Sequence, residues 1–78
     1  LQLKVDLGEN RPRQVVAGIK EFYSASELVG TQACVVANLK PAKLMGLLSE
    51  GMLLAAKDEN GLSLIRPEKP KKIGTKIS

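Results

Sequence analysis

Apolar and polar residues alternate strictly over residues 1–7 (Leu-Gln-Leu-Lys-Val-Asp-Leu). This period of two is typical of a half-buried β-strand. Gly8 to Pro12 is turn material, and a second apolar run extends from Arg13 to Ile19. The two segments therefore predict a hairpin with a loop of about four to five residues.

A short helix is predicted after this hairpin. Ser24 and Glu27 have the spacing of a capping box, and Gly30 is a suitable C-terminal stop. Phe22 and Tyr23, just before the helix, have two interpretations. They could stack on nucleic-acid bases, or they could pack the helix against the strands, which is the interpretation we favour.

Residues 31–38 are almost continuously apolar and predict a central strand. Pro41 lacks a backbone donor and disfavours helical geometry at Lys40, so this strand must end in a polar loop. An apolar strand over residues 51–57 is predicted to leave that loop. A loop held between two core strands is a place where a rigid scaffold presents ligand-binding groups.

The remaining chain predicts a turn at residues 58–61, a strand over residues 62–66 and a charged segment over residues 67–72. Residues 73–78 are predicted to pair as a short terminal strand. Five short strands with a single helix after the second favour a small all-β barrel. A chain of 78 residues forms one domain with a small core, because it buries only about 60% of its unfolded surface. Its apolar stretches are far shorter than the ~18 residues of a membrane span.

Composition argues against an enzyme. The chain has no histidine, which excludes Ser-His-Asp and Cys-His mechanisms. Its one cysteine, Cys34, lies in an apolar run and is interpreted as a small buried hydrophobe. No glycine-rich phosphate loop of familiar spacing is present. We therefore expect no catalysis by this domain, no metal and no cofactor.

The charge balance favours a polyanionic partner. Twelve Lys and Arg against eight acidic residues give a formal charge of +4 and a pI near 9.5. Salt-dependent attraction to phosphates is the default interaction for such a chain.

The segment from Asn38 to Met52 (Asn-Leu-Lys-Pro-Ala-Lys-Leu-Met-Gly, then Ser-Glu-Gly-Met) closely resembles the tRNA-binding oligonucleotide/oligosaccharide-binding (OB) domain family. That family includes C-terminal domains of bacterial methionyl-tRNA synthetases, structure-specific tRNA-binding proteins and endothelial monocyte-activating polypeptides. The likeness extends from Leu3 through Gly74 and is nearest to the synthetase version.

The resemblance implies a five-stranded OB barrel with one short helix. Residues 1–78 would form a single tRNA-binding domain, with residues 67–78 as a C-terminal extension. The family's first strand has no counterpart here, and the chain begins with Leu1 inside a strand, so we expect an N-terminally incomplete fragment. The resulting free sheet edge is a candidate for pairing with a second chain, which predicts a homodimer or higher oligomer.

The resemblance also implies an RNA-binding face at or beside five matching positions: Asn38, Lys40, Lys43, Ser49 and Met52. The two lysines suit phosphate oxygens. The asparagine and serine suit a base edge or sugar hydroxyl, and the methionine offers a soft apolar cover.

Other interpretations of these residues remain open. The asparagine could cap the strand end, the lysines could be merely solvated, and we expect Met52 in the core more than on the surface. The pair Leu47-Leu48 also departs from the family, in which many members carry a charged residue near this point.

The sequence thus predicts a non-catalytic, cytoplasmic tRNA-binding domain of methionyl-tRNA synthetase. It would bind tRNA by shape and phosphate contacts and aid dimerisation. The alternative is a dimerisation module, or an export-chaperone-like domain of the same fold that binds apolar peptide without an RNA ligand.

Overall fold

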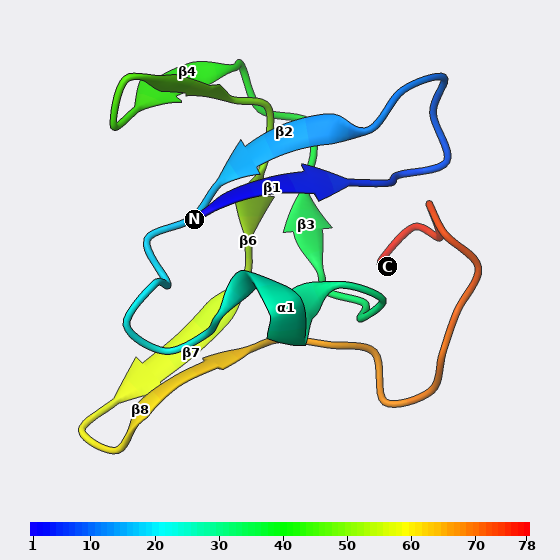
Figure 1. Cartoon of the computed structure of the whole chain (residues 1–78). Coiled ribbons are helices and arrows are strands. Elements are labelled where there is room, and N and C mark those ends of the chain that lie inside the picture. Colours follow the sequence, from blue (N-terminus) through cyan, green and yellow to red (C-terminus); the bar gives the residue numbers. More distant parts are fainter.

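The computed structural model describes all of residues 1–78. The predicted hairpin is present as β1 (Gln2–Val5) paired antiparallel with β2 (Arg13–Val16), with Leu3 opposite Val15 (Figure 1). Leu1 extends the pairing, because its amine donates to the carbonyl of Ala17 at 2.7 Å and its carbonyl accepts from the Ala17 N–H at 2.9 Å.

Three further predicted strands are present but shorter than expected. β3 (Val35–Val36) pairs with β6 (Met52–Leu53), and β7 (Ala55–Asp58) forms a hairpin with β8 (Gly61–Leu64). The predicted strand over residues 51–57 divides at Leu54. The Leu54 N–H donates to Cys34 and its carbonyl accepts from Ile65, so this residue bridges the two ladders.

The polar loop of the prediction contains a hairpin that the sequence did not lead us to expect. β4 (Ala42–Leu44) pairs with β5 (Leu47–Ser49), with Lys43 opposite Leu48. Met45 and Gly46 connect them with φ values of 52° and 77°. Positive φ at both central residues is the turn geometry that matches the right-handed twist of paired strands. The expectation of a continuous loop was therefore wrong.

The helix α1 (Ala25–Leu28) follows the prediction. The Ser24 N–H donates to Glu27 Oε1 at 2.9 Å, and this bond lowers the pKa of the Glu27 carboxyl. Beside the helix, the Tyr23 hydroxyl accepts from the Leu64 N–H at 3.2 Å, and Lys57 Nζ lies 5.4 Å from the centre of the Phe22 ring. Both aromatic side chains thus pack on β7 and β8, as we favoured.

The chain is all-β apart from this helix, as predicted. Its strands form four two-stranded ladders. Hydrogen bonds between residues in or next to different ladders connect them. The Glu50 N–H donates to Gln14 at 2.7 Å, and the Cys34 N–H donates to Ile65 at 3.0 Å. The terminal strand predicted over residues 73–78 is not formed. A turn takes its place, in which the Thr75 N–H donates to Lys72 at 3.1 Å.

The core is small. The buried apolar residues are Val15, Val16, Ile19 and Leu64, and of these only Val15 is fully buried. β1 pairs on one side only, with β2, so its other edge is free. The single helix is too short and too polar to cross a membrane.

The C-terminal residues pack on the β1–β2 turn at Gly74. This residue has φ of 85°, and a Cβ built on it would lie 2.5 Å from the carbonyl oxygen of Leu7. We predict that Gly74→Ala lowers the free energy of unfolding by about 1 kcal/mol or more, since it adds both strain and a clash. Gly18→Ala is the matched control, because its Cβ meets nothing within 4 Å and its φ is not positive. Urea unfolding of both variants measures the difference, and equal losses would contradict the packing.

Candidate nucleic-acid interface

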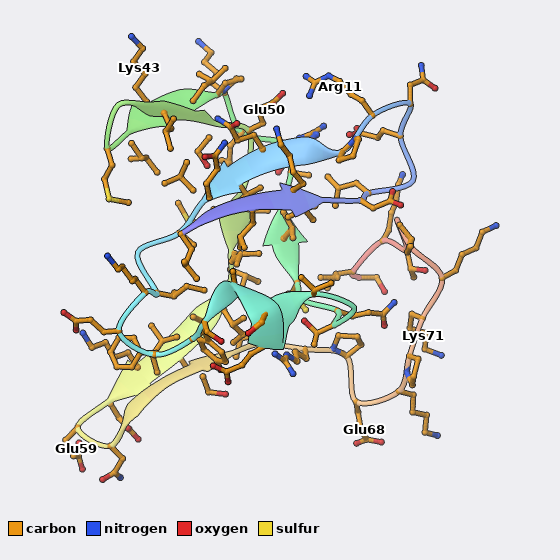
Figure 2. All side chains as sticks on the ribbon, in the orientation of Figure 1. Arg11, Lys43, Glu50, Glu59, Glu68 and Lys71 are labelled. Atoms are coloured by element: carbon orange, nitrogen blue, oxygen red, sulfur yellow. The ribbon has the colours of Figure 1, made fainter.

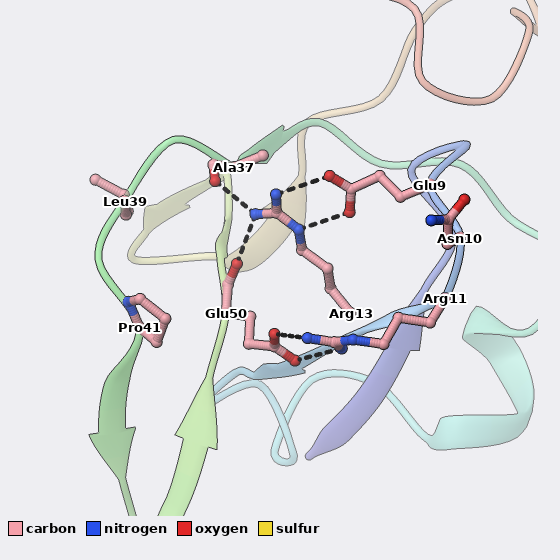
Figure 3. A pocket seen from close by; sticks show the side chains of 8 residues that line it. All are labelled: Glu9, Asn10, Arg11, Arg13, Ala37, Leu39, Pro41 and Glu50. Atoms are coloured by element: carbon pink, nitrogen blue, oxygen red, sulfur yellow. Dashed lines mark hydrogen bonds and ion pairs between the residues drawn. The ribbon is translucent and has the colours of Figure 1, made fainter.

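The predicted RNA-binding residues lie on one excursion of the chain or next to it. We call residues 38–49 the arm: they leave β3 after Ala37, include the β4–β5 hairpin, and return to the body at Glu50. Arg13 of β2 holds both ends of the arm. Its Nη1 donates to the carbonyl of Ala37 at 2.5 Å and to the carbonyl of Glu50 at 3.0 Å (Figure 3).

Glu9 holds Arg13 in this position. Arg13 Nε donates to Glu9 Oε1 at 2.8 Å, and Nη2 donates to Oε2 at 2.9 Å. The bond from Arg13 lowers the pKa of the Glu9 carboxyl. Since the guanidinium is planar and its donors are fixed, a carboxylate on one side orients the nitrogen that faces the two carbonyls.

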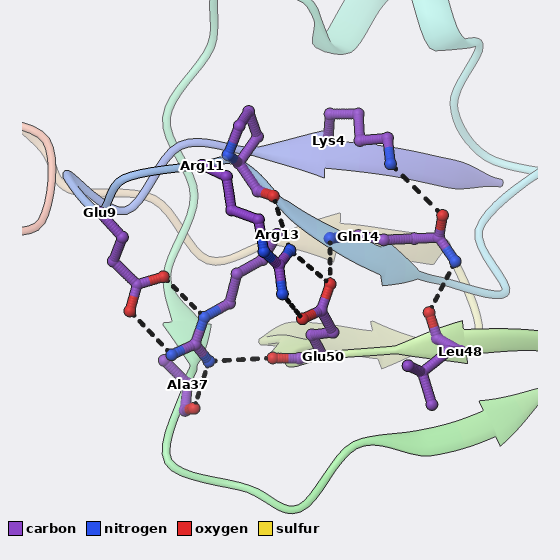
Figure 4. Close-up of polar contacts among 9 residues, drawn as sticks. Lys4, Glu9, Arg11, Arg13, Gln14, Ala37, Leu48 and Glu50 are labelled. Carbon is purple, nitrogen blue, oxygen red and sulfur yellow. Dashed lines mark hydrogen bonds and ion pairs between the residues drawn. The ribbon is translucent and has the colours of Figure 1, made fainter.

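Glu50 forms a second set of bonds at the same place. Arg11 donates to both of its carboxylate oxygens, at 3.1 and 2.6 Å, and the Gln14 N–H donates to Oε1 at 3.1 Å (Figure 4). The bonds from Arg11 and then from Gln14 lower the pKa of Glu50 to about 2. Gln14 also donates from its side chain to the Leu48 carbonyl at 2.7 Å, which fixes β5 against β2.

A shallow pocket of about 420 Å³ lies between the β1–β2 turn and the start of the arm. Figure 3 shows the side chains that line it: Glu9, Asn10, Arg11, Arg13, Ala37, Leu39, Pro41 and Glu50. Each guanidinium in it is paired with a carboxylate, so the pocket is polar but carries no net charge. Its groups hold the base of the arm and are not free for a phosphate.

Lys40 and Lys43 are exposed, and neither takes part in an ion pair. Figure 2 shows Lys43 pointing outward from β4, away from the body of the chain. Asn38 is also exposed, and its side chain forms no hydrogen bond within the chain, so it does not cap the strand end. Three of the five predicted site residues thus present free polar groups along the arm.

The other two predicted site residues differ from each other. Met52 on β6 is 54% exposed, so our expectation that it lies in the core was wrong. Ser49 is 4% exposed. Its Oγ donates to the Gly51 carbonyl at 2.9 Å and accepts from the Val16 N–H at 3.0 Å. The Ser49 hydroxyl therefore joins the arm to β2 inside the fold.

Met45 is a surface feature that the sequence analysis did not single out. It is 72% exposed at the tip of the arm, with leucines 44, 47 and 48 also exposed around it. A left-handed backbone conformation is unfavourable for a methionine. Because the side chain is exposed, burial of apolar surface does not offset this cost. Strain of this kind accumulates at functional positions. The sequence feature that could have indicated this hairpin turn is the Met-Gly pair between two leucines.

The site contains no metal centre: nowhere does the chain gather three or more His, Cys, Asp or Glu side chains that could hold an ion.

The bonds to Glu50 predict a pH dependence. A depressed carboxyl pKa contributes stability that is present above the unfolded pKa and is lost as the pH falls through the folded pKa. For Glu50 this window runs from about 4.5 down to about 2. We expect Glu50→Gln to unfold at lower urea than the parent chain at pH 7, and the two midpoints to converge as the pH falls to about 2. Glu68→Gln, on an exposed residue without an ion pair, is the control. A difference between midpoints that stays constant with pH would contradict the carboxylate's role.

Comparisons with known proteins bear on the family. A family model described as a putative tRNA binding domain matches residues 1–76. The chain is 59% identical, over its whole length, to a methionine–tRNA ligase of Helicobacter pylori (strain J99), of which it covers 12%. It is 55% identical over 73 residues (94% of the chain) to the ligase of Methanocella arvoryzae, of which it covers 10%. The chain therefore spans only a small part of the curated relatives that it matches.

Solved structures share the fold. The chaperone CsaA from Bacillus anthracis superposes with a TM-score of 0.88 at 32% identity, over 99% of this chain and 74% of that one. A MetRS related protein from Pyrococcus horikoshii gives 0.85 at 37% identity, over 99% and 71%. The family model covers nearly the whole chain, and the resemblance seen in the Asn38–Met52 segment is confirmed. The chain belongs to the tRNA-binding domain family.

Proposed function

We propose that this chain binds tRNA without catalysing a reaction, and that the arm is a contact surface for the RNA backbone. The observation that carries the proposal is the arm itself: Lys40 and Lys43 are exposed and unpaired, and Arg13 fixes both ends of the segment that carries them. Fixed cationic groups lose less conformational freedom on binding than mobile ones.

The arm residues would have distinct parts in this contact. The lysines would act as point charges on phosphate oxygens, and the free amide of Asn38 would bond a base edge or a sugar hydroxyl. The exposed side chain of Met52 would cover a base or sugar. Ser49, which is buried, would serve the same site by holding β5 in place.

We further propose that the domain acts within a methionine–tRNA ligase in the cytoplasm. Sequence identity to ligases from bacteria and archaea supports this context. In that setting the domain would raise the affinity of the enzyme for tRNA through shape and charge. Other parts of the enzyme would carry out aminoacylation.

A second copy of the chain is the proposed partner of the free edge of β1. This strand pairs only with β2, and its apolar residues Leu3 and Val5 are only half-buried. Free edges of this kind pair readily with another chain. Edge pairing would cover part of the apolar surface that the small core leaves exposed.

A peptide-binding function is the second candidate. Two CsaA chaperones share the fold with TM-scores of 0.88 and 0.87, and the arm exposes an apolar hairpin tip. A purely apolar surface would favour this alternative. Lys43, however, lies on the same hairpin, so apolar and cationic groups are not separated, and we favour RNA.

We predict that Lys40→Ala/Lys43→Ala weakens tRNA binding and reduces its salt dependence. Each lost phosphate contact lowers the slope of log affinity against log salt by about 0.7–0.9, so the double variant should lose about 1.6. Fluorescence anisotropy with bulk tRNA at several salt concentrations measures the slope.

Lys4→Ala/Lys20→Ala is the matched control, since it removes the same charge from exposed positions outside the arm. If the parent chain, the arm variant and the control variant have equal slopes, the phosphate contacts do not lie on the arm. Absence of tRNA binding by the parent chain would favour the dimerisation or peptide-binding alternatives.

Pairing through β1 predicts an association that depends on concentration and on backbone bonds at that edge. We expect sedimentation at micromolar concentration to show dimers. Leu1 exchanges both backbone bonds with Ala17, so by antiparallel alternation the N–H of Lys4 faces the free edge. Lys4→Pro should therefore yield monomers, because proline removes that donor and leaves the bonds between β1 and β2 in place. Lys20→Pro, outside any strand, is the control for proline itself. A parent chain that sediments as a stable monomer would contradict this proposal.

A further inference from the structure

The last thirteen residues of the sequence have the same formal charge as the whole chain. We call residues 66–78 the basic segment. It contains five of the twelve basic residues and one of the eight acidic ones: Arg66, Lys69, Lys71, Lys72, Lys76 and Glu68. Its formal charge is therefore +4, the value of the whole chain. Residues 1–65, which include the arm, contain seven basic and seven acidic residues and are neutral in sum.

No ion pair within the chain neutralises the charge of the basic segment. The two ion pairs of the chain join Arg11 to Glu50 and Arg13 to Glu9, all outside the basic segment. All five cationic side chains of the segment are exposed. They are therefore free to pair with a counter-charge from outside the chain.

The basic segment is held against the body although it forms no strand. The side chain of Gln32 bonds both backbone groups of Lys71: Nε2 donates to the carbonyl at 2.6 Å, and Oε1 accepts from the N–H at 3.0 Å. Further along, Gly74 packs on Leu7, and the Thr75 N–H and Oγ1 both donate to the Lys72 carbonyl. The lysines therefore extend from a fixed backbone, which reduces the ordering cost of binding.

We propose that the basic segment is a second phosphate-binding surface, separate from the arm, that engages the backbone of the same tRNA. This inference rests on the proposed function. Figure 2 shows Lys43 and Lys71 at opposite sides of the molecule, whose largest extent is 36 Å. An RNA that contacts both surfaces must therefore run along the body of the domain. Folded tRNA offers phosphates over such a length, and a contact of this kind reads shape rather than sequence.

The proposal assigns most of the salt dependence to the basic segment. Two lysines on the arm account for a slope of about 1.6, whereas the five cationic groups of the segment would account for about 4 if all of them contact phosphates. The segment would attract the RNA and hold its backbone, while the arm adds contacts to sugars and bases.

The test compares three variants that each remove two charges, with tRNA binding measured by anisotropy across salt concentrations. Lys71→Gln/Lys72→Gln changes the basic segment, Lys40→Gln/Lys43→Gln changes the arm, and Lys4→Gln/Lys20→Gln is the matched control. All six positions are exposed, and the segment's bonds to Gln32 use only backbone atoms. Of the six lysine side chains only Lys4 forms a hydrogen bond, to Gln14 Oε1 at 3.4 Å, so we expect the fold to be preserved in all three variants. We expect the slope to fall by about 1.6 for the segment variant and to change little for the control.

Chemical acetylation gives a readout that needs no substitution. In the parent chain, tRNA should slow acetylation of lysines 69, 71, 72 and 76, as measured by mass spectrometry, and leave Lys4 and Lys20 unchanged.

Each contrary outcome has a separate meaning. If the segment variant keeps the parent slope while the arm variant loses it, the second surface is overturned and the proposed function stands. If the segment and control variants lose equal slope, only net charge matters, and the second surface is again overturned. If the parent chain binds no tRNA at low salt, the proposed function fails and this inference fails with it.

Discussion

The bonds of one guanidinium determine where the arm lies. Arg13 joins the carbonyls of Ala37 and Glu50, which stand at the two ends of a twelve-residue excursion. Without this contact the arm would depend on the bond from the Gln14 side chain to Leu48, the bond from the Val16 N–H to Ser49, and the bonds between Gln14 and Glu50. Both carbonyls are partly buried, and such a group is costly to leave without a donor. Arg13 therefore has a structural role, since it positions the two ends of the arm. The remaining donors of Arg13 are bonded to Glu9, so its charge is not available to a ligand.

Basic residues in this domain therefore have two physical roles. Arginines 11 and 13 form bidentate bonds that a lysine would not reproduce, because an ammonium lacks the planar arrangement of donors. The unpaired charges are mostly lysines, on the arm and in the basic segment. A lysine is a compact charge with rotatable donors, suited to phosphates whose position varies. This division is consistent with a surface that recognises the shape of a nucleic acid rather than its sequence.

The sequence was sufficient wherever structure depends on residues close in the chain. The capping box of Ser24 and Glu27, the hairpin around residues 58–61 and the packing role of Tyr23 were all predicted and are present. The Arg13 contacts were not, because Ala37 and Glu50 are 24 and 37 residues away and contribute only carbonyl oxygens. No side-chain pattern marks an acceptor that every residue possesses.

The same distinction explains what the sequence did not reveal about burial at the site. Ser49 and Met52 were both predicted site residues, and Met52 was expected in the core more than on the surface, yet the serine is buried and the methionine exposed. Burial at these positions depends on which side of β5 and β6 packs against β2 and β3. The apolar run after Gly51 does not show which side chains point toward those strands. The hairpin within the arm was missed because Met45 occupies a turn position that asparagine or glycine usually fills.

β2 connects the stability of the domain to its proposed function. This strand contributes half of the buried apolar core, through Val15 and Val16, and also contains the residue that fixes the arm. Its only full-length partner is β1, whose other edge is free. A second chain paired at that edge would restrict β1, and through it β2 and the arm. Dimerisation would then support RNA binding in two ways: it would add a second set of cationic groups, and it would make the arm of each copy more rigid. The effect of dimerisation on the arm should be large because the core is small. A domain with few buried residues has few other contacts that fix the position of β2.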